Sequence, residues 1–125
     1  MKKSTSFSVK ERMQSFVPAF NGVKLLFKNE HNAWVHLFFM IVSIALGTIL
    51  QLNNVEWIFV ALAISLVFLS ELFNTAIEKL SDKVEPNFDS AIGAVKDYAS
   101  AAVLIACCCA VLVGGIIFIP KLNLF

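Results

Sequence analysis

The sequence predicts an all-α membrane protein, with three transmembrane helices preceded by an amphipathic helix on the membrane surface. Hydrophobic residues make up 58% of the 125 residues, and the mean hydropathy is +0.79. A soluble domain of this length has too little interior to bury so much apolar surface. The apolar residues also gather into long runs of about the length that crosses a bilayer. We therefore expect one small domain whose solvent is lipid.

The N-terminal part of the chain is polar at first and then amphipathic. Residues 1–14 are polar and basic, and no helix is expected there. From about Ser15 to Lys28, apolar side chains recur at steps of three and four, with lysines on the opposite side. Pro18 fits a helix that starts at Ser15, because the first turn tolerates proline. A helix over about 15–28 suits the headgroup layer of a membrane. Packing against protein is the alternative, and both can hold at once.

Two apolar runs in the first two thirds of the chain predict spans at about 33–52 and 55–77. His36 lies just inside the first span, where a hydrogen bond to a neighbour is its expected role. The helix of the second span continues to about Lys83. A polar turn with Pro86 then closes it.

The third apolar run predicts a span over about 99–119, which Pro120 is expected to stop. Its first residues are small, which lets helices approach closely in lipid. The three adjacent cysteines at 107–109 have neither a disulfide pattern nor the spacing of a zinc site. We expect them to act as packing residues.

The positive charges predict the orientation in the membrane. Six Lys or Arg residues precede the first span, and Lys79, Lys83 and Lys96 lie between the second and third spans. The turn between the first two spans has none. By the positive-inside rule, the N-terminus and the second loop face the cytoplasm and the C-terminus lies outside. The net charge of +1 gives no indication of a nucleic-acid partner.

A stripe of polar residues extends along the helix of the second span. From Glu71, the offsets to Asn74, Glu78 and Asp82 are three, seven and eleven, which places all four on one helix face. Glu71 still lies within the apolar run, where a carboxylate is costly and marks a functional site. The polar groups expected to converge on the cytoplasmic side are Glu30, Glu71, Asn74, Glu78, Asp82, Lys96 and Asp97, with Arg12 and Lys24 nearby.

Such a cluster has the parts that phosphoryl transfer needs. Mg²⁺ binds through one or two carboxylates together with substrate phosphates, and lysine supplies charge for phosphate oxygens. A carboxylate among apolar side chains can serve as general base for a hydroxyl. The five glycines form no phosphate-binding loop. The residues alone therefore leave the use of a nucleotide open.

Two motifs resemble a known family. The segment ELFNTAIEKLSD at 71–82, followed by KDYASAAVLI at 96–105, is similar to the small bacterial integral-membrane lipid kinases, diacylglycerol kinase and undecaprenol kinase. The resemblance covers about residues 15–113. It implies a kinase in the bacterial cytoplasmic (inner) membrane that phosphorylates a lipid alcohol with ATP and Mg²⁺. It also implies a helix-bundle homotrimer whose active sites are shared between neighbouring subunits.

The resemblance further implies roles for individual residues. Glu71 matches the catalytic base that deprotonates the lipid hydroxyl, and Glu30 and Glu78 match the carboxylates that hold Mg²⁺ against the ATP phosphates. Asn74 matches an amide that orients Glu71 or the lipid headgroup, and Ser100 matches a lipid contact. The positions that match ATP contacts are Arg12, Glu30, Glu78, Asn87, Phe88, Asp89, Lys96 and Asp97.

Two other classes of protein were weighed against the kinase. An ion- or proton-translocating subunit could use Glu71 as its carrier, but such a carboxylate belongs near mid-bilayer and among small residues. A purely structural bundle could pair its acids with lysines, which would satisfy Asp82 but not easily reach Glu71. The pattern Glu30-His31-Asn32 with His36 is closer to the undecaprenol kinase branch. The sequence does not decide between the two lipids.

Overall fold

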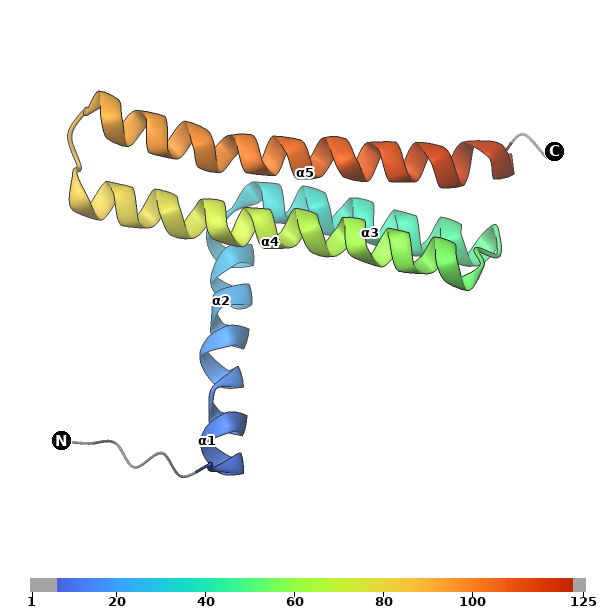
Figure 1. The fold of residues 1–125 in the computed structure, drawn as a ribbon, viewed down its shortest axis with the longest axis horizontal. Coiled ribbons are helices and arrows are strands. Elements are labelled where there is room, and N and C mark those ends of the chain that lie inside the picture. Colours follow the sequence, from blue (N-terminus) through green and yellow to red (C-terminus); the bar gives the residue numbers. More distant parts are fainter. Residues whose placement is uncertain (1–6, 123–125) are drawn as a thin grey trace.

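The protein consists of helices within residues 7–122, the part of the chain that the computed structural model describes. The helices are α1 (Val9–Gln14), α2 (Phe16–Asn29), α3 (His31–Ile49), α4 (Asn54–Val84) and α5 (Ser90–Leu122). Helices α3, α4 and α5 are long and apolar enough to cross a membrane. They form a bundle, and the arm made of α1 and α2 projects crosswise from it (Figure 1). The predicted class, three spanning helices after an N-terminal helix, is confirmed.

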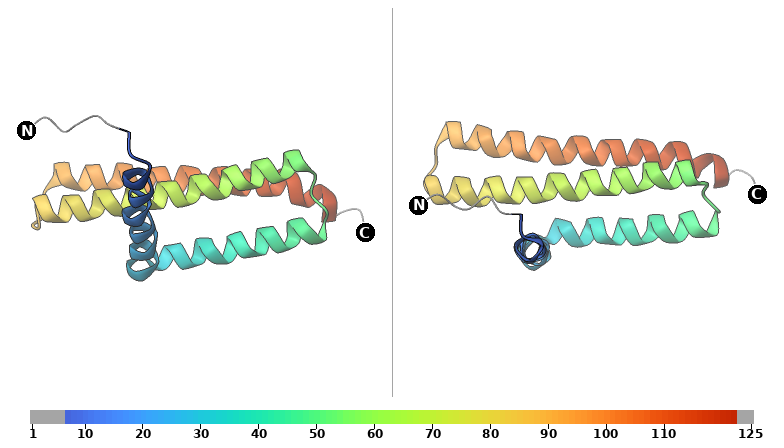
Figure 2. Two further views of the ribbon diagram at one scale, coloured as in Figure 1. Left: turned by 90° about the horizontal axis from the view of Figure 1, so that it is seen from below. Right: turned by 60° about the horizontal axis from the view of Figure 1, so that its bottom comes forward.

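Helix α4 is the centre of the bundle. Both α3 and α5 pack against it, and they have few or no close contacts with each other. The two further views show α4 between its neighbours (Figure 2). Most of the buried residues of α4 recur at steps of three and four, which makes one buried stripe along the helix. Its members are Val60, Ala63, Val67, Glu71 and Thr75, and Ser81 is buried farther along.

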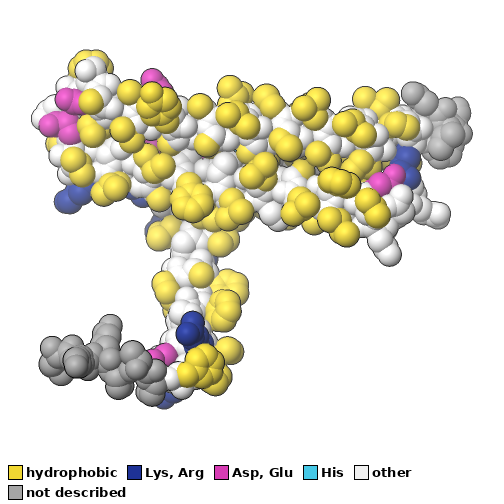
Figure 3. All heavy atoms as spheres, viewed as in Figure 1, with side chains coloured by type: hydrophobic (Ala, Val, Ile, Leu, Met, Phe, Trp, Pro, Cys, Tyr) yellow, Lys and Arg dark blue, Asp and Glu magenta, His cyan; other side chains and the backbone are white. Residues whose placement is uncertain are grey.

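The outside of the bundle is apolar. Hydrophobic side chains cover the face seen in Figure 3, and the charged side chains of the bundle gather toward its two ends. Large residues such as Ile105 and Leu62 are more than half exposed. Contiguous apolar surface of this extent marks a membrane-facing protein. The expected arrangement, with lipid around the bundle, fits this surface.

The arm begins earlier than predicted, because residues 9–14 form α1. Ser8 is its N-cap and accepts a hydrogen bond from the Glu11 N–H at 3.4 Å, in a Ser-x-x-Glu spacing that favours a helix start. Ser15 does not cap α2 with its side chain. Its backbone is helical, and its hydroxyl donates to the Arg12 carbonyl at 2.6 Å. Residues 1–6 of the expected helix-free segment lie outside the described residues.

Helix α3 ends in a tight turn, which makes it shorter than the predicted span. The Leu52 N–H donates to the Gly47 carbonyl at 3.0 Å and the Gln51 N–H to that of Thr48 at 3.3 Å. This pair of bonds is the Schellman motif, which requires the residue after the C-cap to adopt the left-handed conformation. Gln51 is that residue, with φ of 52°.

The start of α4 is tied to the end of α5. Asn53 and Glu56 form a capping box, with bonds of 3.0 and 2.8 Å between side chain and backbone. The same Glu56 carboxylate lies 3.1 Å from the Lys121 ammonium. Pro120 was expected to stop α5, but the helix continues to Leu122. A proline within a helix removes one backbone hydrogen bond and crowds the carbonyl four residues before it. Helix α5 does end within one turn of Pro120, and Lys121 in that turn pairs with Glu56.

The turn between α4 and α5 is short, so α5 begins well before the predicted span. The Asp89 carboxylate accepts hydrogen bonds from the N–H groups of Ala91 and Ile92, both at 2.9 Å. It thereby caps the first turn of α5. The predicted spans at 55–77 and 99–119 are the apolar parts of these two longer helices.

We predict that Gly47→Val destabilises the hairpin of α3 and α4. The indole of Trp57 packs on Gly47, and a Cβ there would lie 2.7 Å from its nearest ring carbon. Overpacking of this kind costs about 1–3 kcal/mol of unfolding free energy. Denaturant unfolding in detergent micelles, followed by tryptophan fluorescence, measures the loss. Gly22→Ala is the matched control, because a Cβ there meets nothing within 4 Å. An unchanged midpoint for Gly47→Val would contradict this packing.

Candidate active site

The predicted polar stripe of α4 begins with a buried carboxylate. Glu71 is only 2% exposed, and it lies between Val67 and Thr75 in the buried stripe of α4. Removing an ionised carboxylate from water is expensive unless it is paired and hydrogen-bonded. The partner of Glu71 is therefore the first question about this site.

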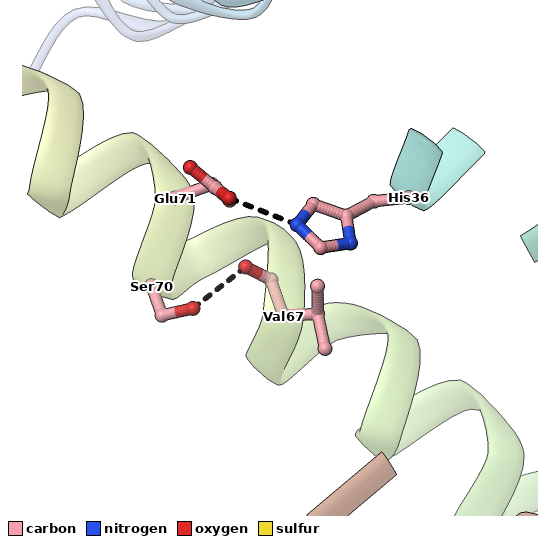
Figure 4. Close-up of polar contacts among 4 residues, drawn as sticks. All are labelled: His36, Val67, Ser70 and Glu71. Carbon is pink, nitrogen blue, oxygen red and sulfur yellow. Dashed lines mark hydrogen bonds and ion pairs between the residues drawn. The ribbon is translucent and has the colours of Figure 1, made fainter. Parts of the chain in front are cut away.

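That partner is His36 of α3. Its Nε2 lies 2.8 Å from Glu71 Oε1 (Figure 4), and the prediction that His36 bonds to a neighbour is confirmed. Within residues 7–122 this is the one hydrogen bond or ion pair that Glu71 makes. Ser70, the preceding residue, donates to the Val67 carbonyl of its own helix at 2.8 Å and so does not compete. The contact joins α3 to α4.

The pair lines a cavity of about 440 Å³ between α3, α4 and α5. The Asn74 side-chain oxygen is buried without a hydrogen-bond partner in the described part of the chain. It is therefore free to accept a hydrogen bond from a ligand. The cavity is lined by Asn32, Val35, His36, Glu71, Asn74, Glu78, Ser100, Val103, Leu104 and Cys107. It thus places a carboxylate, an imidazole and an unpaired amide oxygen around one space.

An apolar groove of about 340 Å³ adjoins this cavity. Val35, His36 and Cys107 line both spaces, so the polar cavity and the groove are adjacent. The remaining lining residues of the apolar groove are Phe39, Met40, Ser43, Val60, Ala63, Ile64, Val67, Phe68, Ala110, Val111, Val113, Gly114 and Phe118. A molecule with a polar end and an apolar chain matches this pair of spaces.

Aromatic contacts fix the end of the arm beside the cavity. The rings of Phe27 on α2 and Phe68 on α4 lie 6.0 Å apart, and His36 meets Phe68 edge-on at 6.3 Å. The Trp34 indole N–H donates to the Phe27 carbonyl at 2.8 Å. The junction between α2 and α3, which contains Glu30, is held against the bundle by these contacts.

A family model described as prokaryotic diacylglycerol kinase matches residues 18–118, most of the chain. The chain belongs to this diacylglycerol kinase family. The resemblance found in the two motifs is therefore confirmed, and the chain is a member of a family of lipid kinases.

Individual relatives carry two names. The chain is 35% identical over 109 residues to a diacylglycerol kinase of Synechocystis, which is 86% of this chain and 62% of that protein. It is 32% identical over 109 residues to an undecaprenol kinase of Bacillus subtilis, covering 87% of this chain and 89% of that one. A diacylglycerol kinase of Haemophilus influenzae is 35% identical over 98 residues, or 78% and 83% of the two chains. The chain thus spans less than two thirds of the Synechocystis protein.

In this diacylglycerol kinase family member, the cavity brings together four of the predicted site residues, Glu71, Asn74, Glu78 and Ser100. Glu30 is partly buried at the junction of α2 and α3 and does not line the cavity. Lys96 and Asp97 lie about one turn before Ser100 on α5. The Lys96 ammonium is 2.8 Å from Asp82 of α4, so Asp82 pairs with a lysine whereas Glu71 pairs with a histidine.

The remaining predicted ATP contacts are not gathered at the cavity. Arg12 belongs to α1, at the far end of the arm (Figure 1), and its guanidinium lies over the Phe7 ring at 5.3 Å. Asn87 and Phe88 are exposed in the turn between α4 and α5. The carboxylate of Asp89 is engaged as the cap of α5. Their contact with ATP stays a prediction.

Sequence reasoning did not select Asn32 or His36 as site residues. The signal was present, because the two are four residues apart and therefore share one face of α3, directly after Glu30. Among the described residues no group of three or more His, Cys, Asp or Glu side chains could hold a metal ion alone. Glu78, however, makes no hydrogen bond or ion pair within residues 7–122. A free carboxylate fits Mg²⁺, which takes few protein ligands and shares phosphate oxygens.

Proposed function

We propose that this protein transfers the γ-phosphoryl group of ATP to the hydroxyl of a membrane lipid, either diacylglycerol or undecaprenol. The observation that carries the proposal is Glu71, a buried carboxylate in a polar cavity that adjoins an apolar groove. Both lipids have a primary alcohol at one end of a long apolar chain. Membership of the diacylglycerol kinase family supports the same reaction.

In the proposed mechanism, Glu71 is the general base. The lipid hydroxyl donates a hydrogen bond to the Glu71 carboxylate and gives up its proton to it as its oxygen attacks the γ-phosphorus; the bond from that phosphorus to the bridging oxygen of the β-phosphate breaks, and ADP leaves. The unpaired Asn74 side-chain oxygen is positioned to hold the lipid headgroup. Glu78 and Glu30 would hold Mg²⁺, which neutralises charge on the ATP phosphates when bound. Lys96 and Asp97 would contact the nucleotide from α5.

The lipid chain is proposed to lie in the apolar groove. Its lining is almost entirely apolar side chains of three helices, and it shares Val35, His36 and Cys107 with the cavity. A lipid in the groove would therefore present its alcohol to Glu71. The two relatives are named for different lipids, one for diacylglycerol and one for undecaprenol. Which of these lipid chains the groove accepts is therefore left to experiment.

The proposal includes an orientation and an assembly. The lysines around the turn between α4 and α5 favour a cytoplasmic position for that end of the bundle, where ATP is available. The assembly is a homotrimer with shared sites, as the family resemblance implies. Arg12 belongs to α1, at the end of the arm away from the bundle (Figure 1), which is the geometry expected if Arg12 serves a neighbouring subunit.

We predict that Glu71→Gln abolishes turnover while Mg·ATP still binds. The amide keeps the shape of the side chain but cannot take the proton, and loss of a general base costs about 10²–10⁴-fold in kcat. ATP consumption in mixed micelles containing either diacylglycerol or undecaprenol measures the turnover of the variant. The same assay on the wild-type protein identifies the lipid. Ser70→Ala is the control, since Ser70 bonds only to its own helix. If Glu71→Gln turned over the lipid that the wild-type protein uses at the wild-type rate, the base role would be excluded.

We predict that Glu78→Gln raises the Mg²⁺ concentration needed for half-maximal activity. The substitution removes a full negative charge from a ligand of a cation that depends on one or two carboxylates, so the requirement should rise about tenfold or more. A Mg²⁺ titration at fixed ATP measures the shift. Glu85→Gln is the matched control, because Glu85 lies in the turn after α4. An unchanged titration curve would remove Glu78 from the metal site.

We predict that Gly114→Leu raises the KM for the lipid and leaves the KM for ATP unchanged. Gly114 lines the apolar groove, and a leucine side chain there would occupy the space of several methylenes, each worth about 0.8 kcal/mol when buried. The test compares initial rates over a range of lipid mole fraction. Gly115→Leu is the matched control, since Gly115 does not line the groove. Equal effects of the two variants would argue against a lipid chain in the groove.

A further inference from the structure

We propose that His36 is a positioning residue for Glu71, which fixes one oxygen of the carboxylate and leaves the other free for the substrate hydroxyl. This inference rests on the proposed function, because it takes Glu71 as the base. It adds a residue of α3 to a reaction so far assigned to α4.

Glu71 depends on a single donor. Its side chain is 3% exposed, and His36 Nε2 at 2.8 Å is the partner that the described residues supply. The two lysines of α5 are engaged elsewhere, Lys96 by Asp82 and Lys121 by Glu56. A buried carboxylate left without a donor would reorient or bind a proton. The direction in which the Glu71 oxygens point is therefore set by one imidazole.

The hydrogen bond also fixes the position of the hydrogen. An ionised carboxylate only accepts hydrogen bonds, so Nε2 of His36 must carry the hydrogen when Glu71 is ready to act as a base. This bond uses Oε1 of Glu71. The proton from the lipid alcohol then goes to the other oxygen, Oε2. His36 keeps its own hydrogen throughout and takes no proton from the substrate.

The imidazole is itself held in place. Its ring meets the ring of Phe68 edge-on, with centroids 6.3 Å apart and planes at 78°. Phe68 lies three residues before Glu71, so one face of α4 supplies both contacts to His36. Phe27 of α2 packs on Phe68 in turn. The side chain of His36 is only 17% exposed. A ring restricted in this way can hold a carboxylate in one orientation.

The test compares two substitutions that differ in their hydrogen-bonding groups. His36→Leu fills a similar volume without a donor, and we expect kcat to fall about 10- to 100-fold, as when a reacting group is displaced. The KM for ATP should not change, because His36 acts on the base. The KM for lipid is no criterion of this role, since His36 also lines the groove proposed for the lipid chain. His36→Gln offers an N–H at a similar reach and should recover most of kcat. His31→Leu is the matched control, because His31, the other histidine, is exposed at the start of α3.

A second comparison isolates the coupling to Glu71. Glu71→Asp withdraws the carboxylate by one methylene and separates it from the imidazole. If His36 acts through Glu71, adding His36→Leu to Glu71→Asp should cost far less than the same change in the wild-type protein. Thermal unfolding of each variant in micelles checks that the fold is retained. Should His36→Leu fail to fold, His36→Asn replaces it, since its shorter side chain cannot reach Glu71.

The outcomes distinguish a failure of the base role of Glu71 from a failure of the positioning role of His36. Wild-type turnover in Glu71→Gln overturns the base role and this inference together. An inactive Glu71→Gln with wild-type kcat in His36→Leu overturns only the positioning role of His36. Equal losses for His36→Leu and His36→Gln, or equal costs in the wild-type and Glu71→Asp backgrounds, also overturn it. A loss of kcat that glutamine rescues and that disappears in Glu71→Asp supports it.

Discussion

The hydrogen bond between His36 and Glu71 is the interaction on which the rest of the site depends. A carboxylate within the apolar part of a membrane helix carries a large desolvation cost, and it is retained only where other helices satisfy it. Here α3 supplies the donor and α4 the acceptor, at 2.8 Å. The contact therefore joins two helices and, at the same time, fixes one oxygen of the carboxylate that lines the cavity.

The contacts of α3 differ from those of α5. Ion pairs join α4 to α5 near both ends, Lys121 with Glu56 and Lys96 with Asp82, and the two helices pack along their length. Helix α3 is held to α4 at one end by the indole of Trp57 on Gly47 and toward the other end by His36. Because α3 and α5 both pack on α4 and hardly on each other, space remains between them. The cavity and the apolar groove occupy that space.

Much of this arrangement could be predicted from the sequence, and the failures have physical causes. The three spans follow from long apolar runs, and the stripe of Glu71, Asn74 and Glu78 follows from helical spacing. Helix α1 was missed because the capping signal of Ser8 is short and its segment is polar. Pro120 was expected to stop the third helix, and α5 ends two residues after it, at Leu122. The ion pair between Lys121, in the last turn of α5, and Glu56 is a tertiary contact, which local sequence does not encode.

The site shows the same limit of sequence reasoning. The stripe on α4 is a property of one helix, so its spacing predicts which residues face the cavity. The partner of Glu71 comes from 35 residues away in the chain, and no local pattern specifies that pairing. His36 was expected to bond to a neighbour, but the identity of the neighbour needed the fold. Arg12 belongs to α1, at the end of the arm away from the bundle (Figure 1), and its contact with the nucleotide stays a prediction.

For the proposed reaction, the apolar groove would determine how the lipid reaches the site. Phe39 and Val111, which line it, are 60% and 74% exposed, so the groove opens sideways toward the surrounding bilayer. A long-chain alcohol can then enter by lateral diffusion and never leave the hydrocarbon phase. For the proposed reaction, the quantity that governs saturation is the substrate's two-dimensional density in the leaflet. Diluting it with inert lipid would slow the enzyme, even when the total amount in the suspension stays the same.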